Sequence, residues 1–201
     1  MPVLLVATTN RGKLAEYKSL LVGLDLEFVT LDQAGIRQEA EENYATFIEN
    51  ARSKARFYAG LSGLLTLADD SGLEVDALGG EPGVRSSRYA GDNTTDVDRI
   101  SFLLNKLKDV PPEKRQARFK CVIAIASPNG HVETVSGECE GLIALEPRGE
   151  NGFGYDPIFY LPQYGKTIAE MDSELKNEIS HRGRAARKAR EVLACMLTEK
   201  L

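Results

Sequence analysis

Two adjacent aspartates, Asp69 and Asp70, directly follow a short apolar run and precede Ser71 and Gly72. Carboxylates at the end of a buried strand are costly to leave unpaired, because burial penalises their charge. Mg²⁺ would relieve this cost, since it prefers oxygen ligands and completes its shell with waters and substrate phosphates. Side chains alternate along a strand, so at most one of the two is expected to face a reacting centre. The alternative is a turn, which Asp, Ser and Gly all favour.

A polar loop near the N-terminus is a candidate phosphate site. It lies between an apolar run and a segment with helical spacing, and it consists of Thr8, Thr9, Asn10, Arg11, Gly12 and Lys13. A helix that follows such a loop offers backbone N–H groups and a favourable dipole to an anion, and Lys13 adds a positive charge. The loop is not a Walker A motif, because the GxxxxGK[ST] pattern is absent. Simple helix capping by Thr9 or Asn10 is the alternative.

A glycine-rich segment from Gly152 to Pro157 is a candidate site for a flat ligand. Phe153 stands between two glycines, which let the backbone approach a ligand closely, so its ring could stack on a base. Asp156 could accept hydrogen bonds from the base edge or the sugar. A tight turn that contributes aromatic residues to the core is the alternative.

A basic cluster begins at Lys176 and ends at His181 and Arg182, just ahead of the expected C-terminal helix. Such groups can bind the carbonyl edge of a purine or neutralise phosphate. The alternative is an exposed basic turn that continues into a solvated helix face. Glu39, Glu41 and Glu42 form an acidic cluster near an expected helix N-terminus, and Lys54 follows on that helix; for these residues solvated roles are the alternative.

The bulk composition indicates a globular protein. The chain has 201 residues, 42% of them apolar and 27% charged, which suits one domain, either a large one or a compact two-lobed one. A net charge of −5 argues against a non-specific nucleic-acid coat protein but does not exclude an anionic small-molecule substrate. No signal peptide and no membrane span is expected, so the sequence indicates a cytoplasmic protein.

The apolar pattern predicts an α/β fold with a mixed sheet. Strands are expected at 3–7, 64–68, 119–126, 132–145 and 158–161, and helices after residue 13, over 44–59, after an N-cap at Asp96, and over 183–197. Asn129-Gly130 is a strong hairpin signal between the third and fourth of these strands. The segment in the middle of the chain could form a second lobe.

Together and in this order, six segments resemble the inosine triphosphate pyrophosphatase family. They are Ala7-Thr8-Thr9-Asn10-Arg11-Gly12-Lys13, Thr46-Phe47-Ile48-Glu49-Asn50-Ala51, Ala68-Asp69-Asp70-Ser71-Gly72, Leu78-Gly79-Gly80-Glu81-Pro82-Gly83-Val84, Gly152-Phe153-Gly154-Tyr155-Asp156-Pro157 and Ser180-His181-Arg182. Because they extend from residue 7 to residue 182, the resemblance covers essentially the whole chain. It implies hydrolysis of non-standard purine nucleoside triphosphates (ITP, dITP and XTP) to the monophosphate and pyrophosphate.

The resemblance also implies a role for each candidate residue. Glu42 and Asp70 would hold Mg²⁺, and Asp70 would orient or deprotonate the attacking water. Substrate would be bound by Thr8, Thr9, Asn10, Arg11, Gly12, Lys13, Lys54, Ser71, Phe153, Gly154, Tyr155, Asp156, Lys176, His181 and Arg182. Glu42 is chosen over Glu39 and Glu41 because its spacing to Asp70 agrees with the family pattern. Asp69 is assigned no role.

The family fold implied by the resemblance is elongated and two-lobed, with a central mixed sheet flanked by helices and the active site in the cleft. Residues 1–201 would form one such domain, and a homodimer is expected. Two alternatives stay open. One is a pyrophosphatase of another modified nucleotide or of a pyrimidine nucleotide, and the other is a catalytically silent nucleotide sensor, against which the intact Asp69, Asp70 and Lys13 speak.

Overall fold

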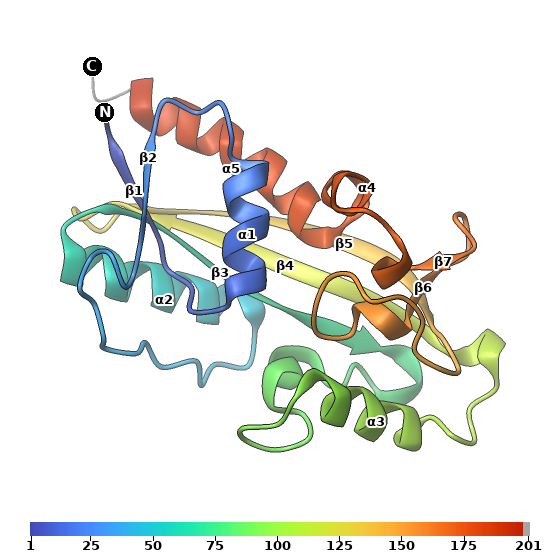
Figure 1. Cartoon of the computed structure of the whole chain (residues 1–201). Coiled ribbons are helices and arrows are strands. Elements are labelled where there is room, and N and C mark those ends of the chain that lie inside the picture. The colour runs from blue at the N-terminus through green and yellow to red at the C-terminus, as the bar shows by residue number, and fades with distance from the viewer. Residues whose placement is uncertain (199–201) are drawn as a thin grey trace. The chain divides into compact units, whose positions relative to one another are not determined.

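The computed structural model describes residues 1–198 and contains a seven-stranded mixed sheet with the strand order β2-β1-β3-β4-β5-β6-β7 (Figure 1). The strands are β1 (Val3–Val6), β2 (Glu27–Thr30), β3 (Leu65–Val75), β4 (Gln116–Ala126), β5 (Val132–Ile143), β6 (Phe159–Leu161) and β7 (Lys166–Thr167). β1 pairs in parallel with β2 and β3, whereas β6 pairs antiparallel with β5 and β7. The predicted α/β class with a mixed sheet is confirmed.

The chain divides into two compact units. The first consists of Met1–Asp70, Cys121–Gly137 and the chain from Arg182 onward, and the second consists of Ser71–Lys120 and Glu138–His181. The boundaries fall inside β3, β4, β5 and the C-terminal helix, so these elements contribute residues to both units. The expectation of one two-lobed domain with its site in a cleft stays a prediction.

In the first unit, helices cover both faces of the parallel strands (Figure 1). The helices are α1 (Arg11–Leu20), α2 (Phe47–Ser62) and α5 (His181–Thr198). Leu4 and Val6 of β1 pack with α1 and α5, whereas Leu5 packs with Ala51 and Ala55 of α2. Because side chains alternate along a strand, this arrangement assigns odd and even positions of each strand to different helices.

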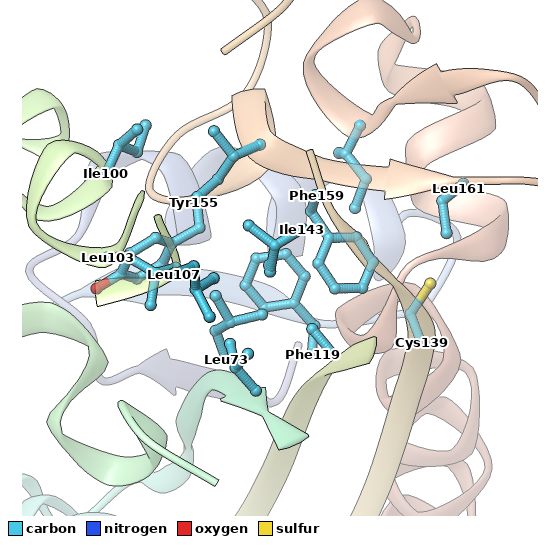
Figure 2. Close-up of a cluster of buried hydrophobic side chains, with 14 of the residues drawn as sticks. Leu73, Ile100, Leu103, Leu107, Phe119, Cys139, Ile143, Tyr155, Phe159 and Leu161 are labelled. Carbon is cyan, nitrogen blue, oxygen red and sulfur yellow. The ribbon is translucent and has the colours of Figure 1, made fainter. Parts of the chain in front are cut away.

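In the second unit, the core gathers around two phenylalanines (Figure 2). The rings of Phe119 in β4 and Phe159 in β6 lie with their centroids 4.5 Å apart. Leu103 and Leu107 reach this cluster from α3 (Asp96–Lys106) and the residue after it, and Ile179 reaches it from α4 (Ser173–Ile179). The three-residue to six-residue 3-10 helices of this unit are Asp76–Leu78, Gly83–Arg88, Pro112–Lys114, Asp156–Ile158 and Ile168–Glu170.

The predicted elements are largely present, but several boundaries were wrong. The strand expected to end at Ala68 continues to Val75, so the turn alternative for Asp69-Asp70-Ser71-Gly72 is wrong. The second helix begins at Phe47 rather than Tyr44, because the Thr46 side chain accepts the Glu49 N–H and caps it. The sequence analysis assigned no element to β2, β7 or α4.

The N-cap of α3 is Thr95 and not the expected Asp96. Thr95 and Asp98 form a reciprocal capping box, in which each side chain accepts the backbone N–H of the other residue. Asp96 is thereby the first helical residue, and its carboxylate is available for other contacts. The C-terminal helix likewise begins two residues before the expected Gly183, at His181.

Among residues 1–198, the structure contains no helix that combines the length and the apolar character needed to cross a membrane.

Replacement of Leu103 tests the core of the second unit. Its side chain is fully buried, so Leu103→Ala should lower the free energy of unfolding by about 2–5 kcal/mol through lost burial and the cavity left behind. Val97 lies on the same helix and is 70% exposed, so Val97→Ala is the matched control and should have little effect. Urea denaturation followed by circular dichroism measures both; equal effects of the two variants would contradict the packing described.

Candidate active site

Asp69 and Asp70 lie within β3 and point to opposite faces of the sheet in the first unit. Asp69 shares the alternation of Leu67, which packs with α1 and α5, and Asp70 shares that of Ala68, which packs with α2. Both carboxylates are buried, with relative exposures of 1% and 6%. The expectation that the two side chains diverge is confirmed.

The Asp69 carboxylate is surrounded by cationic side chains. Its Oδ2 lies 2.9 Å from Lys13 Nζ and 3.7 Å from Arg182 Nη2, and the Cys121 thiol donates to it at 3.8 Å. Burial alone would raise the pKa of Asp69, but the charges of Lys13 and Arg182 outweigh it and hold the pKa well below its usual range. Asp69 is therefore a permanent anion at neutral pH.

The loop before α1 places Lys13. Asn10 is the N-cap of α1, and its Oδ1 accepts the Lys13 N–H at 3.0 Å, while Thr8 Oγ1 accepts the Asn10 N–H at 3.2 Å. Capping by Asn10, the alternative raised for this loop, is thus present. The cap occupies the Lys13 N–H, while Thr9, Asn10 and Arg11 are exposed at the helix N-terminus, a position that favours an anion.

Asp70 has different surroundings on the other face. Asn50 of α2 donates from Nδ2 to Asp70 Oδ2 at 2.9 Å, and the Asn50 side-chain carbonyl accepts the Tyr44 N–H at 3.0 Å. Burial, reinforced by the charge of Glu42 and opposed mainly by that of Lys54, raises the pKa of Asp70 to about 6. Adjacent aspartates thus carry pKa shifts in opposite directions.

Lys54 joins Glu42 to the backbone of β3. Its Nζ lies 2.6 Å from Glu42 Oε1 and donates to the Asp69 carbonyl oxygen at 3.0 Å. The side chain is buried, so the solvated role considered for Lys54 is wrong. Burial lowers the pKa of Lys54, but the carboxylates of Glu42 and Asp69 more than compensate and raise it.

The donors around Asp70 suit a divalent cation. Asp70 and Glu42 are two hard oxygen donors whose mutual repulsion contributes to the raised pKa of Asp70, and a cation between them would remove this penalty. Residues 1–198 contain no group of three or more His, Cys, Asp and Glu side chains placed to hold a metal. Two carboxylates are the number that Mg²⁺ commonly takes from a protein when waters and phosphates supply the rest.

In the second unit, the Phe153 loop is held by its own aspartate. Asp156 Oδ2 accepts the Phe153 N–H at 2.9 Å and pairs with Lys176 Nζ at 2.6 Å, and Lys176 Nζ lies 4.7 Å from the Phe153 ring centroid. A Cβ at Gly152 would lie 2.1 Å from Asp156 Oδ2, so this contact requires glycine. The structure therefore brings Phe153, Asp156 and Lys176 together, and their contact with a base stays a prediction.

Tyr155 and Ser71 occupy separate places in the second unit. The Tyr155 hydroxyl donates to the Ser86 carbonyl oxygen at 2.9 Å, and its side chain is buried in the core. The core-aromatic alternative therefore holds for Tyr155. Ser71 continues β3 directly after Asp70 and is half-buried.

His181 and Arg182 are buried at the start of α5, so the exposed-turn alternative is wrong. In the second unit, the His181 ring stacks on Phe119 with centroids 4.6 Å apart and an angle of 14° between the planes. In the first unit, Arg182 Nη1 donates to Glu16 Oε2 at 2.6 Å, in addition to its contact with Asp69. Glu16 was missed by the sequence analysis, because nothing in its local sequence distinguishes it from a solvated helix position.

Comparison with known proteins assigns the chain to a family. Residues 4–192 match the Ham1 family. The chain is 51% identical over 190 residues to a dITP/XTP pyrophosphatase of Desulforamulus reducens, with 94% of each chain covered, and 51% identical over 182 residues to that of Thermus thermophilus, with 90% of this chain and 87% of the relative covered.

Solved structures of related proteins have the same fold as this chain. A HAM1 protein from Coxiella burnetii superposes with a TM-score of 0.88 at 46% identity, covering 96% of this chain and 99% of the other. A nucleoside-triphosphatase or dITP/XTP pyrophosphatase from Mycobacterium abscessus gives 0.76 at 42% identity, covering 93% and 98%.

The seven-stranded mixed sheet and the agreement with these structures over more than nine-tenths of the chain define an α/β protein with the fold of the HAM1 structures. More particularly, the chain belongs to the Ham1 family. The relatives carry the name dITP/XTP pyrophosphatase, so the family resemblance predicted from the six motifs is confirmed.

Replacement of Asp69 tests the buried ion cluster of the first unit. Asp69→Asn removes the charge but keeps the size, which leaves Lys13 and Arg182 without their shared carboxylate; the free energy of unfolding should fall by about 3–5 kcal/mol. Asp25→Asn makes the same chemical change at an exposed position of this unit and should be nearly silent. Denaturant titration of both variants measures the difference, and an Asp69→Asn protein as stable as the Asp25→Asn protein would refute the cluster's structural importance.

Proposed function

We propose that this protein hydrolyses non-standard purine nucleoside triphosphates, dITP, XTP and ITP, to the monophosphate and pyrophosphate. Family membership and the name shared by relatives about half identical over nine-tenths of the chain support the activity. The observation that carries the mechanism is the opposite environment of the two adjacent aspartates. Asp69 is paired with the cations Lys13 and Arg182, whereas Asp70 is buried on the other face, accepts a hydrogen bond from Asn50 and is repelled by the charge of Glu42.

Asp70 is the proposed acceptor of the proton from the attacking water. Burial beside Glu42 raises the pKa of Asp70 to about 6 in the absence of a cation, and a cation bound there would lower it, so that the carboxylate is ionised and able to accept a proton. Asp70 and Glu42 are the residues that would hold Mg²⁺, which when bound supplies positive charge to the phosphates. Asn50 fixes the Asp70 carboxylate through its hydrogen bond at 2.9 Å.

The phosphate chain is assigned to the loop before α1 and to two lysines. Thr8 and Asn10 supply neutral hydrogen-bonding groups, and Lys13 and Lys54 supply charge close to β3. Thr9, Arg11 and Gly12 complete the N-terminal turn, whose backbone N–H groups favour an anion. Lys13 would thus serve both Asp69 and the substrate.

The base is assigned to residues of the second unit and to the start of α5. Phe153 would stack on the purine, Asp156 would fix its position, and Lys176 and His181 would lie along its edge; Ser71, Gly154 and Tyr155 are further proposed contacts. Hypoxanthine and xanthine carry an acceptor oxygen where adenine carries a donor amine, so donor groups such as Lys176 and Arg182 favour the oxidised bases. Arg182 keeps this role as a proposal, although its guanidinium also contacts Glu16 and Asp69.

Two expectations accompany this proposal. A homodimer and a cytoplasmic location are implied by the resemblance and by the composition, and both stay predictions. Nucleic acid is not expected as a partner, since the net charge is −5.

Replacement of Asp70 separates an enzyme from a catalytically silent sensor. Asp70→Asn keeps the hydrogen-bonding shape but cannot accept the proton, so turnover of dITP should fall by about 10²- to 10⁴-fold. Binding of dITP measured without Mg²⁺ should persist, because the loop before α1 and the Phe153 loop are unchanged and the metal ligand altered at Asp70 plays no part. Steady-state kinetics and calorimetric titration with dITP measure the two effects.

Asp76→Asn is a control with the same chemical change at a residue that lies outside the proposed site and pairs with Arg118 on the surface. It should leave turnover close to that of the unaltered protein. An Asp70→Asn protein with near-normal turnover would rule out the assigned base. An unaltered protein that binds dITP without hydrolysing it would favour the sensor.

A further inference from the structure

The loop that carries Phe153 is fixed by two carboxylates, and the proposed function uses only one of them. Two consecutive backbone N–H groups of this loop each donate to a carboxylate. Phe153 donates to Asp156 within the loop, and Gly154 donates to Asp96 Oδ2 at 2.7 Å. Asp96 lies 58 residues earlier in the chain, at the first position of α3. All of these residues belong to the second unit.

Asp96 is itself held in place. Its other carboxylate oxygen pairs with the Arg99 guanidinium one helical turn later, and Arg99 also donates to the Thr94 carbonyl oxygen. The helix dipole further favours an acidic side chain at this position. Because Arg99 holds the Asp96 carboxylate in a fixed position, the hydrogen bond from Gly154 to this carboxylate fixes the position of the Gly154 N–H.

The loop depends on an outside anchor because of its backbone. Gly152 and Gly154 both have positive φ angles, 78° and 64°, so the chain reverses sharply on either side of Phe153. Glycine has no side chain to restrict its backbone, so a loop with two glycines samples many conformations unless hydrogen bonds hold its N–H groups in place. The hydrogen bond from Gly154 to a charged acceptor therefore restricts the direction of the neighbouring Phe153 ring.

We infer that Asp96 is a positioning residue for base recognition, which acts by fixing the Gly152–Asp156 loop and hence the plane of the Phe153 ring. The inference rests on the proposed function in one respect, namely that Phe153 contacts the base. It adds a residue that lies in none of the six motifs. Asp96 contacts Gly154 and Arg99 and is not among the residues assigned to the phosphates or the metal, so its loss should affect the binding of the base and not the chemical step.

Three variants test this role with dITP as substrate. Asp96→Ala removes the acceptor of the Gly154 N–H, so KM should rise about tenfold, the equivalent of one charge-assisted hydrogen bond, while kcat changes little. Asp96→Asn retains a side-chain oxygen that can accept this N–H but loses the charge and the ion pair with Arg99, so its KM should lie between those of Asp96→Ala and the unaltered protein. Asp98→Ala disrupts the capping box with Thr95 at the same helix end, and it should lower stability without raising KM.

Hydrogen exchange of the Gly154 amide, measured without nucleotide, distinguishes this inference from the proposed function. Exchange should be faster in Asp96→Ala and unchanged in Asp98→Ala. Unchanged exchange in Asp96→Ala would overturn the inference and leave the proposed function intact. Faster exchange with an unchanged KM would overturn both the inference and the assignment of Phe153 to the base. An equal rise in KM for Asp96→Ala and Asp98→Ala would reduce Asp96 to a helix-stabilising residue.

Discussion

The buried carboxylate of Asp69 is the constraint on which the first unit depends. A charge in the interior of a sheet requires partners, and the chain supplies them from two helices that are distant in sequence. Lys13 comes from the first turn of α1 and Arg182 from the first turn of α5. Glu16, one turn after Lys13, pairs with Arg182 in its turn. These contacts fix the start of both helices against β3.

The same constraint separates the roles of two neighbouring residues. Alternation along β3 turns Asp70 away from Lys13 and Arg182 and toward α2, where Asn50 donates a hydrogen bond to it; Glu42, in the segment before α2, adds a repelling charge. Asp69 therefore lies in a buried ion cluster, whereas burial and the charge of Glu42 raise the pKa of Asp70 to about 6. Lys54 links the two sides, since it contacts the Asp69 carbonyl oxygen and the Glu42 carboxylate. In the proposed mechanism, the paired charges around Asp69 leave Asp70 as the carboxylate that accepts the proton.

The sequence predicted the fold class, the family and the residues that gather around Phe153, because these depend on local patterns and ordered motifs. It misplaced element boundaries and left alternatives open where distant contacts override local preference. Asp-Asp-Ser-Gly favours a turn, but Lys13, Arg182 and Asn50 satisfy the two carboxylates and let β3 run on to Val75. His181 and Arg182 begin a strongly basic stretch whose composition is typical of a solvated helix. In the structure, His181 stacks on the ring of Phe119, and Arg182 pairs with the carboxylates of Glu16 and Asp69.

Contacts across long stretches of chain leave no local signal. Asn50 was visible only as a member of a motif, and Glu16 and Asp96 looked like ordinary helix positions. Each of these three side chains makes its hydrogen bond with a partner that lies 20 to 166 residues away in the sequence. Spacing within one element cannot reveal such partners, whereas the structure shows them directly.

The most direct test of the central claim is the identity of the products. The protein is incubated with Mg²⁺ and with dITP, XTP or ATP, and pyrophosphate and orthophosphate are measured separately over time. We predict pyrophosphate and the nucleoside monophosphate as the first products, with dITP and XTP hydrolysed faster than ATP. Orthophosphate and the diphosphate as first products, or a preference for ATP, would contradict the claim.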